Sequence, residues 1–472
     1  MSDLKKNSII QLSAGKMVHQ GVCISEYEGR KVFIENCIPG EEVNAQIKKI
    51  KRDYLEAAAV EIIAPSQNRV NPKCRHFGIC GGCKIQYIDY NKQLDIKKEI
   101  VEDVMMRIGK LKDIKVENTI GSDPIFCYRN KMEYSFAGKR WLEFDLNYTE
   151  EEKNFALGLH VPNIYDKVLH LKECWLQSEF SNKVRNTVGQ FFNDKKISIH
   201  SLKDRSGLLK ALAIRESFNT NDKMINLITT RFDEKIMEEL GKVLLQVFPQ
   251  VTTFVNSISS PNLSSTLSHE TKIISGRGSI TEILLGKQFE IYANTFFQTN
   301  TKQAEKLFSI VKKIIYKDNL TNKSQNKILI DLFCGVGAIG IVLADQFDFV
   351  HGFEISDEAV FAAKKNAEAN SLKNIDFSVS NLDQGFDFAQ FTNKQNDLTV
   401  ILDPPRAGVS EKTILQLLEL KPRQIIYISC NPSTQARDIE RLSVNYSPKL
   451  VQPFDFFPHT YHIENLIVLG IL

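Results

Sequence analysis

The sequence has no uninterrupted run of about 18 apolar residues in its 472 positions, so a membrane-spanning helix is not expected. Its first residues, MSDLKKNSII, lack the apolar stretch of a secretory signal peptide. We therefore expect a cytoplasmic protein without a membrane partner. With 43% hydrophobic and 25% charged residues the composition is ordinary for a globular protein, and the length allows two or three domains.

An excess of charge of one sign is also lacking. Lys and Arg number 60 and Asp and Glu 57, and the formal net charge of +3 neither demands nor excludes a nucleic-acid partner. A local cationic cluster of Lys48, Lys49, Lys51 and Arg52, with Tyr54 beside it, is a plausible phosphate contact. A solvated loop between two strands explains the same charges about equally well.

The nine cysteines are an odd number in a chain without a secretion signal, which argues against a disulfide framework. Clustered cysteines in a reducing compartment indicate a metal site or catalysis instead. Cys74, Cys80 and Cys83 lie close together in the sequence, and Cys174 is the best candidate for a fourth ligand. Four thiolates hold either zinc or an iron–sulfur cluster, and the spacing does not separate the two. Chance clustering of structural thiols is the simpler alternative.

Three blocks follow one another along the chain. Residues 1–63 alternate with a period of two over about five short strands, which predicts a small β-barrel of OB type. Residues 64–290 open with the cysteine cluster and mix helical and strand patterns, which indicates an α+β domain. Residues 291–472 alternate strands and helices regularly, which predicts a Rossmann-like α/β domain with a parallel sheet and helices on both faces.

A glycine-rich segment, DLFCGVGAIG at residues 331–340, follows a predicted buried strand and opens a helix. Its glycines allow a sharp turn and a close approach to a ligand, and Glu354 ends the next strand, where it can accept hydrogen bonds from ribose hydroxyls. NAD, FAD and S-adenosylmethionine all fit such a loop, and so does a tight turn without a ligand. LDPPRAG at residues 402–408 favours S-adenosylmethionine, because it resembles the acidic-Pro-Pro loop of methyltransferases that act on bases.

Two further residues have side chains suited to covalent and acid–base chemistry. Cys430 ends a predicted strand in YISCNP at residues 427–432, and the helix that begins at Pro432 could lower the pKa of its thiol. Glu464, in HIEN, precedes the last predicted strand and can serve as a base. Considered singly, the cysteine is better explained as a small buried hydrophobe and the glutamate as a solvated strand end.

The segments DLFCGVGAIG, LDPPRAG, YISCNP and HIEN, in this order, resemble the uracil-5-carbon RNA methyltransferase family, whose members make 5-methyluridine in ribosomal and transfer RNA. FQTN at residues 297–300 resembles the Phe-Gln-x-Asn element of that family. The resemblance extends over essentially the whole chain. It implies that residues 291–472 form a class I methyltransferase domain that uses S-adenosylmethionine.

The resemblance also implies a role for each site residue. Cys430 would add to C6 of uracil, which makes C5 nucleophilic enough to attack the methyl group of S-adenosylmethionine. Glu464 would then remove the C5 proton so that the cysteine can be expelled. The residues expected to contact the cofactor are Gln298, Phe333, Glu354, Asn381 and Asp403.

The cysteine cluster resembles the 4Fe–4S site of the ribosomal RNA members, which implies Cys74, Cys80, Cys83 and Cys174 as ligands. Cys127 competes as the fourth ligand, but it lies next to a separate family element, YRNK, so Cys174 is preferred. The first sixty residues resemble the TRAM domain, a small RNA-binding barrel.

The combination of barrel and cluster favours 23S ribosomal RNA as the substrate over transfer RNA. We expect an RNA-binding monomer with no DNA partner. The alternatives are a transfer RNA enzyme, a methyltransferase acting on an exocyclic amine, and a cluster-bearing RNA-binding protein without chemistry.

Overall fold

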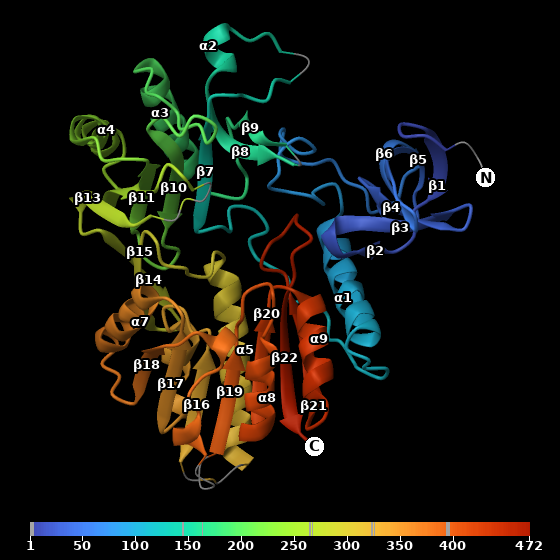
Figure 1. Cartoon of the computed structure of the whole chain (residues 1–472), viewed down its shortest axis with the longest axis vertical. Helices are drawn as coiled ribbons and strands as arrows, with labels where there is room; N and C mark the ends of the chain where they lie inside the picture. Colours follow the sequence, from blue (N-terminus) through green and yellow to red (C-terminus); the bar gives the residue numbers. More distant parts are fainter. Residues whose placement is uncertain are drawn as a thin grey trace.

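The computed structural model describes residues 4–143, 146–162, 164–263, 266, 268–321, 324, 326–392 and 397–472. A small strand-rich sheet begins the chain, a larger sheet with flanking helices follows, and a mixed α/β sheet ends it (Figure 1). Among the described residues, no helix is both long and apolar enough to cross a membrane.

The first sheet has the strand order β1-β5-β6-β4-β3-β2, one strand more than the five or so that the sequence predicts. Alternate residues of its strands, such as Val43, Ala45 and Ile47, are fully buried, because side chains of a strand point to opposite faces in turn. The strands are β1 (Ile9–Ser13), β2 (Met17–Val18), β3 (Val22–Tyr27), β4 (Arg30–Glu35), β5 (Glu42–Ile50) and β6 (Tyr54–Ala64).

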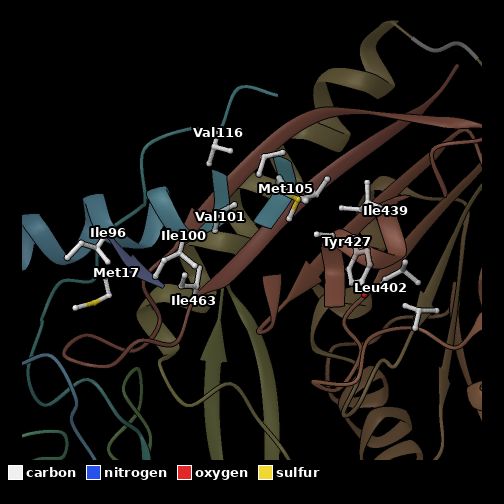
Figure 2. Packing of buried hydrophobic residues seen from close by; sticks show 14 of the residues in the cluster. Met17, Ile96, Ile100, Val101, Met105, Val116, Leu402, Tyr427, Ile439 and Ile463 are labelled. Atoms are coloured by element: carbon white, nitrogen blue, oxygen red, sulfur yellow. The ribbon is translucent and has the colours of Figure 1, made fainter. Parts of the chain in front are cut away.

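Helix α1 (Tyr90–Arg107) connects this barrel to the C-terminal sheet. The Asp89 side chain caps it by accepting from the backbone N–H groups of Asn91 and Lys92. Figure 2 shows the buried face of α1 packed between Met17 of the barrel and C-terminal residues that include Ile463. One continuous apolar core therefore joins the two ends of the chain.

The central sheet has the order β13-β12-β11-β10-β7-β8-β9, and α3 and α4 pack on one of its faces. A separate hairpin, β14 (Ser279–Leu284) with β15 (Lys287–Tyr292), leads from it to the C-terminal sheet. The remaining central elements are β7 (Lys131–Ala137), α2 (Glu150–Lys153), β8 (Ala156–Val161), β9 (Ile164–His170), α3 (Glu179–Asp194), β10 (Leu209–Glu216), β11 (Lys223–Thr229), α4 (Glu234–Val247), β12 (Thr253–Ile258) and β13 (Glu270–Gly276).

The C-terminal sheet has the order β18-β17-β16-β19-β20-β22-β21. Helices α5, α6 and α7 pack on one face, and α1, α8 and α9 pack on the other. Its elements are α5 (Thr301–Thr321), β16 (Lys327–Leu332), α6 (Ala338–Leu343), β17 (Phe349–Glu354), α7 (Asp357–Ala369), β18 (Ile375–Val379), β19 (Asp397–Leu402), α8 (Glu411–Leu420), β20 (Gln424–Ser429), α9 (Pro432–Leu442), β21 (Tyr446–Phe454) and β22 (Glu464–Ile471). Short 3₁₀ helices lie at His19–Gly21, Ala344–Gln346, Leu382–Gln384 and Ala389–Phe391.

The sheet is not parallel throughout, as the sequence pattern suggested. Strands β16 to β20 are parallel, but β22 runs antiparallel to both β20 and β21. A parallel neighbour needs a crossover connection, usually a helix, and the segment 455–463 between β21 and β22 contains none. The final strand therefore inserts beside β20 from the opposite direction, and its first residue lies where β20 ends.

Candidate active site

The glycine-rich loop turns sharply at the end of β16. Phe333 has a φ of 64°, and Gly337 has a φ of 78°. A Cβ atom on Gly337 would lie 2.6 Å from the Phe377 ring, so only glycine fits there. The N–H of Gly340 donates to Asp331 Oδ2 at 3.0 Å, which ties the start of α6 to the strand. Burial raises the pKa of Asp331 to about 7.

Glu354 ends β17 directly beside this loop. Its carboxylate accepts from the N–H of Gly335 at 3.1 Å and from the N–H groups of Ile355 and Ser356. Three backbone donors therefore fix the position of the carboxylate. The end of the next strand, β18, is hydrogen-bonded to the end of β17, because the N–H of Ser380 donates to the Glu354 carbonyl at 2.7 Å. Asn381 follows and caps a 3₁₀ helix.

Asp403 follows β19, and burial raises its pKa to about 7. Gln298 comes from outside the sheet, and its Nε2 donates to Asp403 Oδ2 at 3.4 Å. Asn130 fixes the Gln298 segment by donating to the Gln298 carbonyl at 2.8 Å and to Thr301 Oγ1 at 3.0 Å. The five residues predicted to contact the cofactor thus lie at the carboxyl ends of four neighbouring strands and on one segment that reaches them, where open α/β sheets bind ligands.

Cys430 and Glu464 lie side by side at this same edge. Ser429 at the end of β20 pairs with Asn465 near the start of β22 in an antiparallel register. Cys430 follows Ser429 and Glu464 precedes Asn465, so these two residues are also neighbours. Asn431 caps α9 directly after the cysteine. Glu464 is only 5% exposed, so it is not the solvated strand end that its sequence context allowed.

The electrostatics of the pair differ from the sequence expectation. Burial and the nearby Glu464 raise the pKa of the Cys430 thiol to about 11, although a helix begins two residues later. Burial and Asp403 raise the pKa of Glu464 well above its usual value. The Cys430 thiol is therefore protonated at neutral pH. The sequence allowed the helix at Pro432 to lower this pKa, but the pKa is raised, and desolvation of the thiolate is the largest contribution.

Arg406 is the cation that opposes both shifts, since it lowers the pKa of Cys430 and of Glu464. Its backbone carbonyl accepts from Asn431 Nδ2 at 3.0 Å and from Thr434 Oγ1 at 3.2 Å, so the loop after β19 is fastened to the start of α9. Its Nη2 lies 3.4 Å from Nδ1 of His462, whose pKa burial lowers to about 4. Arg406 was not among the residues predicted from the sequence to form the site, although it stands in the DPPR motif.

The four candidate cluster ligands, Cys74, Cys80, Cys83 and Cys174, line one small cavity between the segment before α1 and the central sheet. Burial, with smaller contributions from the thiols of Cys174 and Cys74, raises the pKa of Cys80 to about 12. The N–H of Gly82 donates to Cys80 Sγ at 3.3 Å. Across the part of the chain that the structure describes, no group of three or more His, Cys, Asp or Glu residues is placed to hold a metal ion. The cluster therefore stays a prediction.

Comparison with known proteins places the chain in a family. Residues 265–471 match the family described as tRNA (Uracil-5-)-methyltransferase, and residues 12–60 match the TRAM domain. An uncharacterized RNA methyltransferase of Bacteroides thetaiotaomicron is 35% identical over 460 residues, which cover 96% of this chain and 99% of the relative. The chain belongs to the RNA uracil-5-methyltransferase family. A Chlorobaculum tepidum relative of the same description is 35% identical over 476 residues, covering 98% and 96% of the two chains.

A solved structure supports the same family membership. The tRNA (uracil-54, C5)-methyltransferase of Pyrococcus abyssi, in complex with S-adenosyl-L-homocysteine, is 25% identical, with a TM-score of 0.73 over 98% of this chain and 100% of that one. The predicted class I fold and TRAM domain are confirmed. As an RNA uracil-5-methyltransferase, the enzyme uses S-adenosylmethionine as its methyl donor and RNA as its substrate. Methylation of an exocyclic amine and RNA binding without chemistry are therefore no longer needed as explanations.

Proposed function

We propose that this enzyme methylates C5 of a uridine in 23S ribosomal RNA through a covalent adduct with Cys430. The observation that carries the mechanism is the strand register Ser429–Asn465, which brings a thiol and a buried carboxyl together beside Asp403. A nucleophile and a base on one side of a pocket are what addition to C6 and removal of the C5 proton require.

In the proposed reaction, the Cys430 thiolate forms a bond to C6 of uracil, and the C5–C6 double bond supplies the electron pair that attacks the methyl group. S-adenosylmethionine would supply that methyl group, and the S–CH3 bond would break with its electron pair left on sulfur, which gives S-adenosylhomocysteine. Glu464 then takes the proton from C5, the double bond re-forms, and the C6–sulfur bond breaks to return the thiolate. The raised pKa of Glu464 suits this step, because a carboxylate that holds protons tightly is a stronger base toward carbon.

Arg406 is assigned the task of stabilising the charged forms of both groups. The thiol has a pKa of about 11 in the free protein, so formation of the thiolate is costly at neutral pH. The guanidinium lowers the pKa of both Cys430 and Glu464, and it does so from a loop that is fastened to α9. The loop therefore holds the cation at the place where negative charge develops.

The test of the chemistry uses two variants with opposite expected results. With labelled RNA and S-adenosylmethionine, Cys430→Ala is expected to form no covalent protein–RNA adduct and no 5-methyluridine. Glu464→Gln is expected to accumulate the methylated adduct, which is visible as a slow band on a denaturing gel. A Cys334→Ala variant is the matched control, since that thiol is buried in the glycine-rich loop and is expected to leave adduct formation intact. Methyl transfer by Cys430→Ala would contradict the proposal.

The choice of ribosomal RNA rests on the TRAM barrel together with the four-cysteine cavity. Transfer RNA is the second candidate, because the structurally similar Pyrococcus abyssi enzyme is a tRNA methyltransferase. Sites of 5-methyluridine in 23S rRNA and tRNA from a deletion strain would separate the two. Loss of a modification in 23S rRNA alone is expected, and loss in tRNA alone would overturn the assignment.

A 4Fe–4S cluster held by Cys74, Cys80, Cys83 and Cys174 is also part of the proposal. Four thiol-bearing residues line one buried cavity, and thiolates are the ligands that such clusters use. The cluster would cross-link the segment before α1 to the loop before α3. Anaerobically purified protein should contain about four irons per chain and absorb visible light. Cys80→Ser should lose the iron and Cys127→Ser, a neighbouring thiol outside the cavity lining, should keep it.

A further inference from the structure

Two cations meet where β7 and β10 of the central sheet pair. Arg215 lies directly opposite Lys131 in the antiparallel register. Their neighbours Met132 and Ile214 belong to the core beneath α3 and α4, so the two cations project from the opposite face. Arg215 is only 4% exposed, and Lys131 is half-buried. Buried cations of this kind are rare unless an anion compensates them.

No carboxylate compensates the pair among the described residues, in which neither Lys131 nor Arg215 forms an ion pair. Glu216, next to Arg215 in sequence, bonds instead to Lys223 at 2.9 Å. Glu133, on the same face as Lys131, is exposed, and its charge contributes less to the pKa of Lys131 than burial and Arg215 do. Burial and the charge of Arg215 lower the pKa of Lys131 to about 8, which shows that the site favours loss of a positive charge or gain of a negative one.

The pair lies beside the segment that carries Gln298. Nη2 of Arg215 donates to the Thr295 carbonyl at 2.9 Å, three residues before the glutamine, and Asn130, adjacent to Lys131, donates to the Gln298 carbonyl. Gln298 in turn reaches Asp403, at the edge where the reacting uracil must lie under the proposed function. An anion between the two cations would thus be close to the nucleotide being modified.

We propose that Lys131 and Arg215 together bind a backbone phosphate of the RNA strand next to the target uridine. This inference rests on the proposed function for its substrate strand. Arginine and lysine are the residues that bind phosphate in nucleic-acid complexes, and such contacts fix the position of the strand rather than read its bases. Lys131 and Arg215, together called the clamp, would hold the RNA strand while the target base leaves the stack to reach Cys430.

The carboxylate of the cofactor's methionine group is the other anion that could occupy such a site. The experiment therefore measures two affinities of the full-length protein at several salt concentrations, one for an RNA fragment containing the target and one for S-adenosylhomocysteine. Lys131→Met is expected to weaken RNA binding about tenfold and to reduce the slope of log Kd against log salt by about 0.7–0.9, the value for one phosphate contact. Affinity for S-adenosylhomocysteine should not change.

Two matched variants separate charge from packing. Lys131→Arg should keep RNA affinity near that of the native protein, and Lys242→Met, an exposed lysine on α4 at the opposite face of the sheet, should leave both the affinity and the slope unchanged. An unchanged salt slope in a folded Lys131→Met variant, or a loss of cofactor affinity with RNA affinity intact, would overturn the clamp. Because binding needs no chemistry, these results are independent of whether Cys430→Ala abolishes the adduct.

Discussion

At the scale of single residues, the Cys430 thiol is held in its protonated form at neutral pH, because its surroundings raise its pKa to about 11. Burial is the largest contribution that raises the pKa of Cys430, and Glu464 adds to it, while Arg406 opposes both. A thiol in this state reacts slowly with adventitious electrophiles, because only the thiolate is nucleophilic. The same neighbours that suppress side reactions are those proposed to act in the reaction itself.

The pH dependence of alkylation tests this description. Since the folded-state pKa of Cys430 is raised to about 11, its alkylation rate with iodoacetamide should increase steadily from pH 7 toward pH 11. Glu464→Gln removes a group that raises the pKa, so its curve should shift to lower pH. Arg406→Met removes a cation that lowers the pKa, so its curve should shift to higher pH. Peptide-level mass spectrometry follows Cys430 separately from the other eight cysteines, and identical curves for all three proteins would refute the assignment.

Residue identities could be predicted from sequence wherever the family motifs name them, but their environments could not. The motifs located Cys430 and Glu464, whereas the burial that raises both pKa values depends on β22 lying beside β20. Lys131 stands in the YRNK element, but its pairing with Arg215 carried no sequence signal, because the two residues are 84 positions apart and meet only through strand pairing. Spacing along the chain does not reveal such contacts.

At the scale of elements, the segment 455–463 between β21 and β22 determines where Glu464 lies. It is held from three directions within the described residues. Nζ of Lys97 on α1 bonds to Asp455 at 2.5 Å, Gln303 Nε2 on α5 donates to the Asp455 carbonyl at 2.7 Å, and Tyr128 donates to the Pro458 carbonyl at 3.1 Å. The loop is therefore a rigid support for Glu464, which follows it directly.

Breaking the buried pair on this loop should destabilise the enzyme strongly. The side chains of Lys97 and Asp455 are 1% and 0% exposed, so Lys97→Met leaves an uncompensated buried carboxylate at a cost of about 3–5 kcal/mol. The midpoint of urea unfolding should fall accordingly, and Lys97→Met/Asp455→Leu should recover much of the loss. Lys98→Met is the control, because the neighbouring side chain is 30% exposed and its removal should cost less than about 1 kcal/mol. Equal effects at positions 97 and 98 would contradict the assigned role.

The elements themselves were largely predictable, and their directions were not. Period-two alternation over residues 1–63 located the strand-rich barrel, whose strands β1 to β6 lie between Ile9 and Ala64. The glycine-rich loop was found between β16 and α6 as expected. The antiparallel insertion of β22 left no trace in its composition, because a buried strand has the same apolar residues whichever way it runs.

At the scale of the whole molecule, the barrel is fixed to the catalytic unit through a shared core rather than a flexible linker. Met17 packs against α1, whose other contacts lie on the C-terminal sheet (Figure 2). His19 on the barrel lies edge-to-face with Tyr461, at a ring distance of 5.7 Å, in the segment that leads to Glu464. The sequence predicted a barrel and a catalytic domain, but not this contact, because it joins residues from opposite ends of the chain.

A barrel held in this way presents its β5–β6 turn at a fixed place, and that turn carries the cations Lys51 and Arg52. Arg52 is 95% exposed, and the nearest carboxylate oxygen, on Asp53, is 4.0 Å away, so both cations are accessible to phosphates. Replacing both cations with serine should weaken binding of a long target RNA. It should also reduce the slope of log Kd against log salt by up to the value expected for about two phosphate contacts. A short hairpin that contains only the target should bind as before, and its saturated methylation rate should not change.

The matched control for this prediction is Lys31→Ser on the same barrel, since that lysine is already paired with Glu26 at 2.8 Å. Its loss should alter neither the affinity nor the slope. If the turn variant and the control behave alike on long RNA, the cationic turn is only a solvated loop. If the turn variant also weakens binding of the short hairpin, the β5–β6 turn contacts RNA at the target itself. The turn would then not contact the RNA segments that flank the target.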